Sequence, residues 1–244
     1  MEIIFVFFIG AVFGSFINAT AYRIVRKKDF IFDRSNCSSC HQQLSFLDMI
    51  PIISYVLMKG RCRYCKNIVS KRYLATEALG GLNAIVCWNL SRTIEVKVLY
   101  FVIFNILLLI SLIDIETKEI SDFYQIFLLS VVVITILIEG MSFNNYIGMI
   151  IISFPLLIIA LLTNSIGGAD VKLFFTLGLL AKTEGILIIY LMTIVFASVF
   201  ALYRLKREKN KKEEIALIPF IYLAFFTYTG FEKYLLNWFI LWLT

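Results

Sequence analysis

Two aspartates stand at the edges of long apolar stretches. Asp114 follows the apolar run from Leu99 to Ile113, and Asp170 lies in the run Gly167-Gly168-Ala169-Asp170 between two further apolar stretches. A carboxyl group at the end of a membrane span is costly to keep dry, so it usually faces a wet cavity or a partner. Two such groups that meet across a helix bundle form a dyad that activates water. The pattern predicts an aspartic protease site inside a membrane.

Each aspartate also has a simpler interpretation. Asp114 is then an interfacial acid, and Asp170 pairs with Lys172 or caps a helix after a glycine turn. Lys172 would either lower the pKa of Asp170 or extend toward lipid headgroups. Gly167 and Gly168 would let a substrate backbone approach closely, because glycine has no Cβ. Other nearby acids are expected to be solvated loop charges: Glu116, Glu119 and Asp122.

Four cysteines form two C-x-x-C pairs, Cys37 with Cys40 and Cys62 with Cys65. Two such pairs match a tetrathiolate zinc site, although the stretch between them is slightly longer than usual. Thiolates fill all four positions, so the predicted site is structural rather than catalytic. Disulfides or spectator thiols are the alternative, and a cytosolic location disfavours disulfides. Two other residues are not expected to bind metal: His41, at the surface, and Cys87, inside a span.

The composition is that of a polytopic membrane protein. Of the 244 residues 60% are hydrophobic and 16% charged, and the mean hydropathy is +0.87. No soluble domain of this length could bury so much apolar surface. The net charge is +6, and basic residues concentrate in segments 23–72 and 204–214. The positive-inside rule places both segments in the cytosol. Membrane topology explains this charge, so no nucleic-acid partner is expected.

Apolar windows predict an all-α protein with about eight transmembrane helices and a small zinc-clipped cytosolic domain. The domain organisation predicted is a first span at 1–22, a cytosolic zinc-binding loop at 23–72, and a bundle at 73–244 with the protease site. Alternating crossings then place Asp114 and Asp170 on the same, cytosolic side. The segment 171–181 is short for a crossing of ~20 residues. The candidate spans are 3–21, 73–90, 97–113, 122–139, 144–162, 171–181, 185–203 and 215–229, followed by a tail at 231–243.

Over most of its length the chain resembles the type IV prepilin leader peptidase family. The similarity begins at Gly14–Arg23, continues through the paired cysteines and Lys59–Tyr73 with Glu77 beyond, and includes the two aspartates and Ile218-Pro219-Phe220. Three positions depart from the family pattern: Ala169 replaces a glycine, Ser121 stands where Ile-Pro is common, and Leu74 stands where Arg-Tyr-Pro is common. None of them removes an acid or a cysteine.

The resemblance implies a membrane endopeptidase of the inner (cytoplasmic) membrane. Such an enzyme removes the short basic leader of type IV prepilins or pseudopilins after a glycine, and Asp114 and Asp170 would be its catalytic residues. Many members also methylate the new N-terminus with S-adenosylmethionine, an activity associated with the cysteine-bearing loop. Weak candidates for cofactor binding are Asn18, Asp48 and Glu77, each equally explained by a structural hydrogen bond. No glycine-rich loop of Rossmann type occurs.

Two other classes stay open from the residues alone. A small ion-coupled transporter could use the membrane-edge aspartates to bind cations, although no internal repeat is visible. A zinc-stabilised adaptor without catalysis would need the cysteines and not the aspartates. The sequence names neither the particular prepilin or pseudopilin nor the oligomeric state, and it does not assign acid and base within the dyad.

Overall fold

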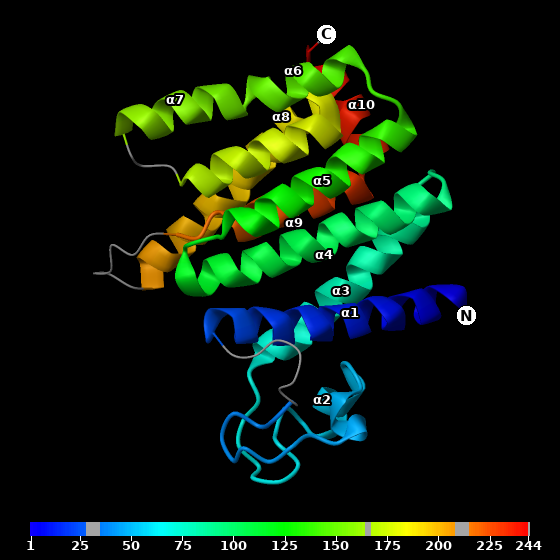
Figure 1. Cartoon of the computed structure of the whole chain (residues 1–244), viewed down its shortest axis with the longest axis vertical. Coiled ribbons are helices and arrows are strands. Elements are labelled where there is room, and N and C mark those ends of the chain that lie inside the picture. The colour runs from blue at the N-terminus through cyan, green and yellow to red at the C-terminus, as the bar shows by residue number, and fades with distance from the viewer. Residues whose placement is uncertain (28–34, 164–166, 208–214, 244) are drawn as a thin grey trace. The chain divides into compact units, whose positions relative to one another are not determined.

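A computed structural model describes residues 1–27, 35–163, 167–207 and 215–243, and all its regular elements are helical (Figure 1). Within these ranges the extended pairings are two isolated bridges, Asn36 with Gln43 and Arg61 with Ile68. The predicted all-α class is confirmed. The chain forms two compact units, Met1–Leu90 and Ser91–Thr244. Parts of both predicted basic segments, residues 28–34 and 208–214, lie outside the described residues.

Two closely packed helices, α1 (Glu2–Val25) and α3 (Lys71–Asn89), dominate the first unit. Glycines make the contact possible, since a Cβ on Gly10 would overlap the carbonyl oxygen of Gly80. Close approach through small residues is typical of helix pairs in membranes. The chain segment that connects α1 to α3 contains the cysteine loops, the 3₁₀ helix η1 (Phe46–Met49) and the short α2 (Ile53–Leu57).

Helix α4 (Ile94–Thr117) forms the core of the second unit. Every residue from Ile103 to Asp114 is buried, as expected for a helix that is apolar on all sides. Helices α5 (Asp122–Glu139) and α9 (Ile218–Gly230) pack against it. The rings of Phe104 and Phe225 join α4 to α9, with centroids 5.0 Å apart.

The remaining helices of this unit gather around α8 (Gly168–Arg207), which packs against α5, α6, α7, α9 and α10. Helix α6 (Phe143–Ile151) is followed directly by α7 (Ser153–Thr163), and α10 (Glu232–Leu243) ends the chain's described part. Figure 1 shows α5 between α4 and α8, and α6 and α7 running along α8. Helix α8 is interrupted at Lys182, whose φ of 61° and ψ of −175° are not helical.

The prediction of eight transmembrane helices is not confirmed. Five helical segments in the described ranges are long and apolar enough to span a membrane: α1, α4, α5, Phe143–Thr163 and α8. Helix α9 has 13 residues and α10 has 12, both short for a crossing. The candidate spans 171–181 and 185–203 are the two parts of the interrupted α8. The candidate span 73–90 corresponds to α3, which belongs with α1 in the first unit.

Candidate active site and cysteine centre

Asp114 lies in the last turns of α4 and is 7% exposed. Its Oδ2 accepts a hydrogen bond of 3.2 Å from the backbone N–H of Ile218, the first residue of α9. The first N–H groups of a helix have no partner within it, and the positive end of the helix dipole favours a carboxylate there. The start of α9 therefore fixes the position of Asp114.

Asp170 lies in the first turn of α8 and is half-buried. The backbone of Gly167 hydrogen-bonds to its carboxyl, and the charge of Asp114 acts on it, so the two carboxyls lie within electrostatic range. A Cβ on Gly167 would stand 3.2 Å from Oδ2 of Asp170. A Cβ on Gly168 would meet nothing within 4 Å. The two predicted aspartates thus lie at the same end of the second unit, with Gly167 beside the carboxyl of Asp170 and open space at Gly168.

Lys172 contacts Asp122 and not Asp170, the partner considered from the sequence. Its Nζ lies 2.5 Å from Oδ1 of Asp122, the first residue of α5, and both side chains are largely exposed. This ion pair joins the start of α8 to the start of α5. It therefore gives Asp122, which was expected to be a solvated loop charge, a defined partner.

The four predicted cysteines converge in the first unit. Their sulfur atoms all lie within 4.8 Å of one another, and the Sγ atoms of Cys37 and Cys65 are 3.9 Å apart. Four thiolates placed tetrahedrally at a Zn–S distance of ~2.3 Å would stand about 3.8 Å apart. The four thiols are free, and 3.9 Å is far longer than a disulfide bond of ~2.05 Å. The four sulfurs therefore fit a zinc site, and their spacing does not fit the disulfide alternative.

The two cysteine loops share one backbone design. In the first, Cys37 N donates to Gln42 O at 3.0 Å, and in the second Cys62 N donates to Asn67 O at 2.8 Å. The residue after each second cysteine, His41 or Lys66, has a positive φ and donates to the carbonyl of the first cysteine. Each loop thereby presents two sulfurs from one tight turn. His41 serves the turn and lies outside the sulfur cluster.

Backbone amides favour the anionic form of one thiol. Hydrogen bonds from Cys40 and Ser39 lower the pKa of Cys37 to about 6, against the opposing effect of burial. Metal ligation needs the thiolate, so these amides favour ligation at Cys37, whereas at Cys65 a backbone hydrogen bond is outweighed by burial and the neighbouring thiols, which raise its pKa to about 11.

A cavity of about 260 Å³ adjoins the cysteine loops. Asp48 and Glu77, two of the weak candidates for cofactor binding, both line it, whereas Asn18 is buried in α1 and is not in its lining. Burial raises the pKa of Asp48, but hydrogen bonds from the hydroxyl and amide of Ser45 outweigh it and hold the pKa below its usual value. Asp48 is therefore anionic at the cavity wall, where the guanidinium of Arg63 lies 3.8 Å from its Oδ1.

Glu77 connects three segments of the first unit. Its Oε1 accepts from the hydroxyl of Ser15 on α1 at 2.9 Å, and its Oε2 accepts from the N–H of Ile52 at 2.7 Å. Ile52 has a φ of 63° and a ψ of −50°, and Ile53 N donates to Pro51 O across it at 2.6 Å. This is a γ-turn of the strained kind, unusual for a β-branched residue. The alternative interpretation of Glu77, a structural hydrogen bond, is thus present, and it supports a turn beside the cavity.

Comparison with known proteins adds the family. The bacterial peptidase A24 N-terminal domain matches residues 8–90, and the type IV leader peptidase family matches residues 101–202. The chain belongs to this family. The first match ends at Leu90, where the first compact unit also ends. No solved structure gives a significant match.

Two curated relatives span most of both chains. The prepilin leader peptidase/N-methyltransferase of Vibrio cholerae serotype O1 is 27% identical over 209 residues, which cover 78% of this chain and 81% of the relative. The protein of the same name from Bacillus subtilis is 25% identical over 205 residues, covering 82% and 81%. A shorter match, 33% identical over 84 residues, is to the Myxococcus xanthus protein of that name.

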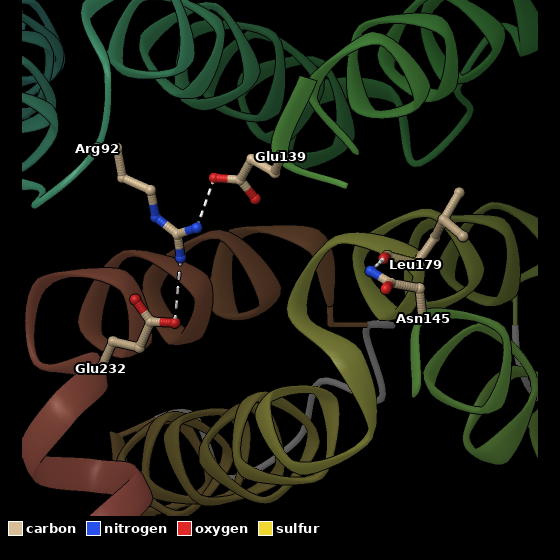
Figure 2. Close-up of polar contacts among 5 residues, drawn as sticks. All are labelled: Arg92, Glu139, Asn145, Leu179 and Glu232. Carbon is tan, nitrogen blue, oxygen red and sulfur yellow. Dashed lines mark hydrogen bonds and ion pairs between the residues drawn. The ribbon is translucent and has the colours of Figure 1, made fainter. Parts of the chain in front are cut away.

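The sequence did not reveal a second polar cluster in the second unit (Figure 2). The guanidinium of Arg92 lies 2.5 Å from Glu139 at the end of α5 and 3.5 Å from Glu232 at the start of α10. These residues line a cavity of about 190 Å³ together with Tyr100, Lys182 and others. The only available signal was the placement of these charges at the ends of apolar stretches, which does not say which of them meet.

Figure 2 also shows how the interruption of α8 is satisfied. Asn145 Nδ2 on α6 donates to the carbonyl of Leu179 at 2.8 Å, and Asn145 is 2% exposed. The last carbonyls of a helical segment lack intrahelical donors, so a break at Lys182 leaves Leu179 in need of one. Asn145 supplies it from another helix.

Proposed function

We propose that this protein removes the short basic leader of type IV prepilins or pseudopilins after a glycine and then methylates the new N-terminus. Curated relatives that match about four fifths of the chain carry both activities in their names. The observation that carries the peptidase assignment is the meeting of Asp114 and Asp170 within electrostatic range at one end of the second unit. These comparisons do not support an ion-coupled transporter.

Cleavage requires one ionised and one protonated carboxyl. Two close carboxyls cannot both ionise cheaply, so the pair shares one proton. The ionised member takes a proton from water, which attacks the scissile carbonyl, and the neutral member protonates the leaving amine. Ile218 holds Asp114 through its backbone N–H, and the open space at Gly168 receives the substrate backbone.

The proposed location is the inner membrane, with the active site at its cytosolic side. In the described ranges five segments are apolar enough to cross a bilayer. We count α3 and each of the two parts of α8 as further crossings, and the positive-inside rule then places the helix ends that carry Asp114, Asp122, Asp170 and Lys172 in the cytosol. A substrate whose basic leader stays in the cytosol and whose apolar helix enters the bilayer presents its cut site at this level.

Methyl transfer is assigned to the first unit. Zinc held by the four cysteines fixes the loops, and S-adenosylmethionine supplies the methyl group when it is bound. The cavity beside the loops offers the sulfonium of the cofactor the carboxylate of Asp48, which Arg63 partly balances, and the rings of Tyr55 and Tyr73. Glu77 contributes by holding the turn at Ile52.

The peptidase test uses detergent-solubilised protein, a model prepilin and S-adenosylmethionine, with mass spectrometry of the products. The wild type should give a cut after glycine and the mass gain of one methyl group. Asp114→Asn and Asp170→Asn should abolish the cut, while Asp122→Asn, which changes an exposed acid at the same helix ends, should keep it. Normal cleavage by both dyad variants would refute the mechanism.

The cofactor and metal assignments are tested on a substrate that has already been cut. Cys37→Ser/Cys62→Ser should lose the zinc measured by elemental analysis and lose methylation. Asp48→Asn should weaken S-adenosylmethionine binding measured by calorimetry, whereas Asp122→Asn should not. Unchanged binding by Asp48→Asn would remove that residue from the pocket.

A further inference from the structure

Helix α5 buries one stripe of side chains, and its first member is polar. The stripe contains Gln125, Leu128, Val131, Val132, Thr135 and Ile136. Gln125 is 5% exposed, and in the described part of the chain neither its Oε1 nor its Nε2 has a hydrogen-bond partner. Thr135, the other polar member, is satisfied within α5 because its hydroxyl donates to Val131 O at 2.8 Å. Gln125 alone in this stripe is buried without partners.

The unpartnered amide lies at the end of the second unit that holds the aspartates. Gln125 follows Asp122 by three residues, so the two are neighbours on one helix face. Asp122 contacts Lys172, which is two residues beyond Asp170. Helix α5 packs against both α4, which carries Asp114, and α8, which carries Asp170. Gln125 is therefore one helical turn deeper than the point where α5 meets the start of α8.

Leaving such an amide unpaired is unfavourable. Each buried donor or acceptor without a partner loses its hydrogen bonds to water and gains none in return, and an apolar side chain of the same size would avoid that cost. Elsewhere in the second unit, buried amides find at least one partner: Asn145 donates to Leu179 O, and Asn105 donates to Phe101 O. The exception at Gln125 points to a partner that arrives with the substrate.

We infer that Gln125 is a substrate-binding residue that pairs with the peptide backbone next to the scissile bond. A carboxamide has both donor and acceptor atoms, and a peptide group offers one acceptor and one donor in return. A peptide must be locally extended to be cut, and its freed N–H and C=O groups are costly in an apolar environment. Gln125 satisfies them beside the dyad. This inference rests on the proposed peptidase function.

The test compares Gln125→Met, of similar length and flexibility, with the wild type. The variant should lose about 5- to 100-fold in kcat/KM for a model prepilin, the loss expected for one or two hydrogen bonds. Its thermal midpoint in detergent should stay equal or rise, because the unpaired groups are gone. Thr135→Val, in the same stripe, should leave kcat/KM unchanged.

The opposite signs of the two readouts separate substrate binding from structure. Unchanged kcat/KM in Gln125→Met, or a parallel fall of kcat/KM and thermal midpoint in both Gln125→Met and Gln125→Leu, would overturn the inference. Failure of the proposed function looks different, since wild type would then not cut the model prepilin at all. Partial recovery of kcat/KM in Gln125→Asn would add support, because the carboxamide is kept.

Discussion

The two ends of the second unit treat their polar groups in opposite ways. At one end Arg92 lies between two carboxylates, and Asn145 supplies the carbonyl left open by the break in α8. At the other, Asp114 accepts one backbone hydrogen bond, Gln125 has no partner among the described residues, and Gly168 borders open space. Paired groups hold helices together, whereas unpaired capacity is available to a substrate. We propose that the first end stabilises the bundle and that the second acts on the substrate.

The largest expected effect is at the aspartate end. Asp114→Asn keeps the size of the side chain and removes its acid–base function, so the cleavage rate should fall by about 10²–10⁴-fold. The thermal midpoint should change little, because the amide oxygen still accepts from Ile218. Single-turnover cleavage with a labelled prepilin measures the rate. A rate within a few fold of wild type would place the chemistry elsewhere.

Arg92→Met should give the reverse pattern. It leaves Glu139 and Glu232 facing each other without their cation, and because both are only partly exposed the free energy of unfolding should fall by about 2–3 kcal/mol. Cleavage per folded molecule should stay near that of wild type. Thermal melting in detergent measures the loss.

The double variant Arg92→Met/Glu139→Gln serves as its control. Neutralising one of the two acids removes the repulsion, so part of the lost stability should return. If the single variant is as stable as wild type, these ion pairs contribute no more to stability than exposed surface pairs do.

Asn145→Ala should destabilise the protein by about 1–2 kcal/mol, because the carbonyl of Leu179 then lacks its donor. Asn145→Asp isolates the cause. It keeps the oxygen that accepts from Ser142 but places a carboxylate oxygen against the carbonyl of Leu179 at a buried position, so it should cost at least as much as Asn145→Ala. A smaller loss in Asn145→Asp than in Asn145→Ala would assign the effect to Ser142. Denaturation curves give the comparison.

The smallest effect on stability is expected at Gly168. A Cβ there meets nothing within 4 Å, so Gly168→Ala should change the free energy of unfolding by at most about 0.5 kcal/mol. Its kcat/KM should nevertheless fall, because the substrate backbone approaches that open space. Gly178→Ala should by contrast lower the free energy of unfolding, since its Cβ would overlap the backbone of Gly148. Unchanged kcat/KM in Gly168→Ala would show that the substrate passes elsewhere.

Much of the fold was readable because apolar runs must be helical in a membrane. The runs around Leu99–Ile113 and 122–139 became α4 and α5 almost as expected. The count of eight spans was not confirmed, because α9 and α10 are short for a crossing and α3 belongs to the other unit. The predicted spans 171–181 and 185–203 are the two helical parts on either side of Lys182, and the break between them depends on contacts such as Asn145 with Leu179, which hydropathy does not record.

The candidate site was readable to the extent that it consists of unusual residue types. Paired C-x-x-C motifs and acids beside apolar runs are rare enough to single out residues, and the structure places the four sulfurs together. The hydrogen-bond partners of these residues could not be predicted from the sequence. Nothing in the sequence indicates that Ile218 donates to Asp114, that Glu77 holds the turn at Ile52, or that Gln125 is buried without a partner.

By itself the sequence determined the class of protein and the family it resembles, and it singled out the residues proposed to carry the chemistry, because these depend on residue types and local spacing. The tertiary structure alone decided which polar groups are paired and which are left open. That distinction depends on helix ends far apart in the chain, such as Arg92 with Glu232 and Asp114 with Ile218. Burial makes an unpaired polar group costly, and burial exists only once the helices have packed.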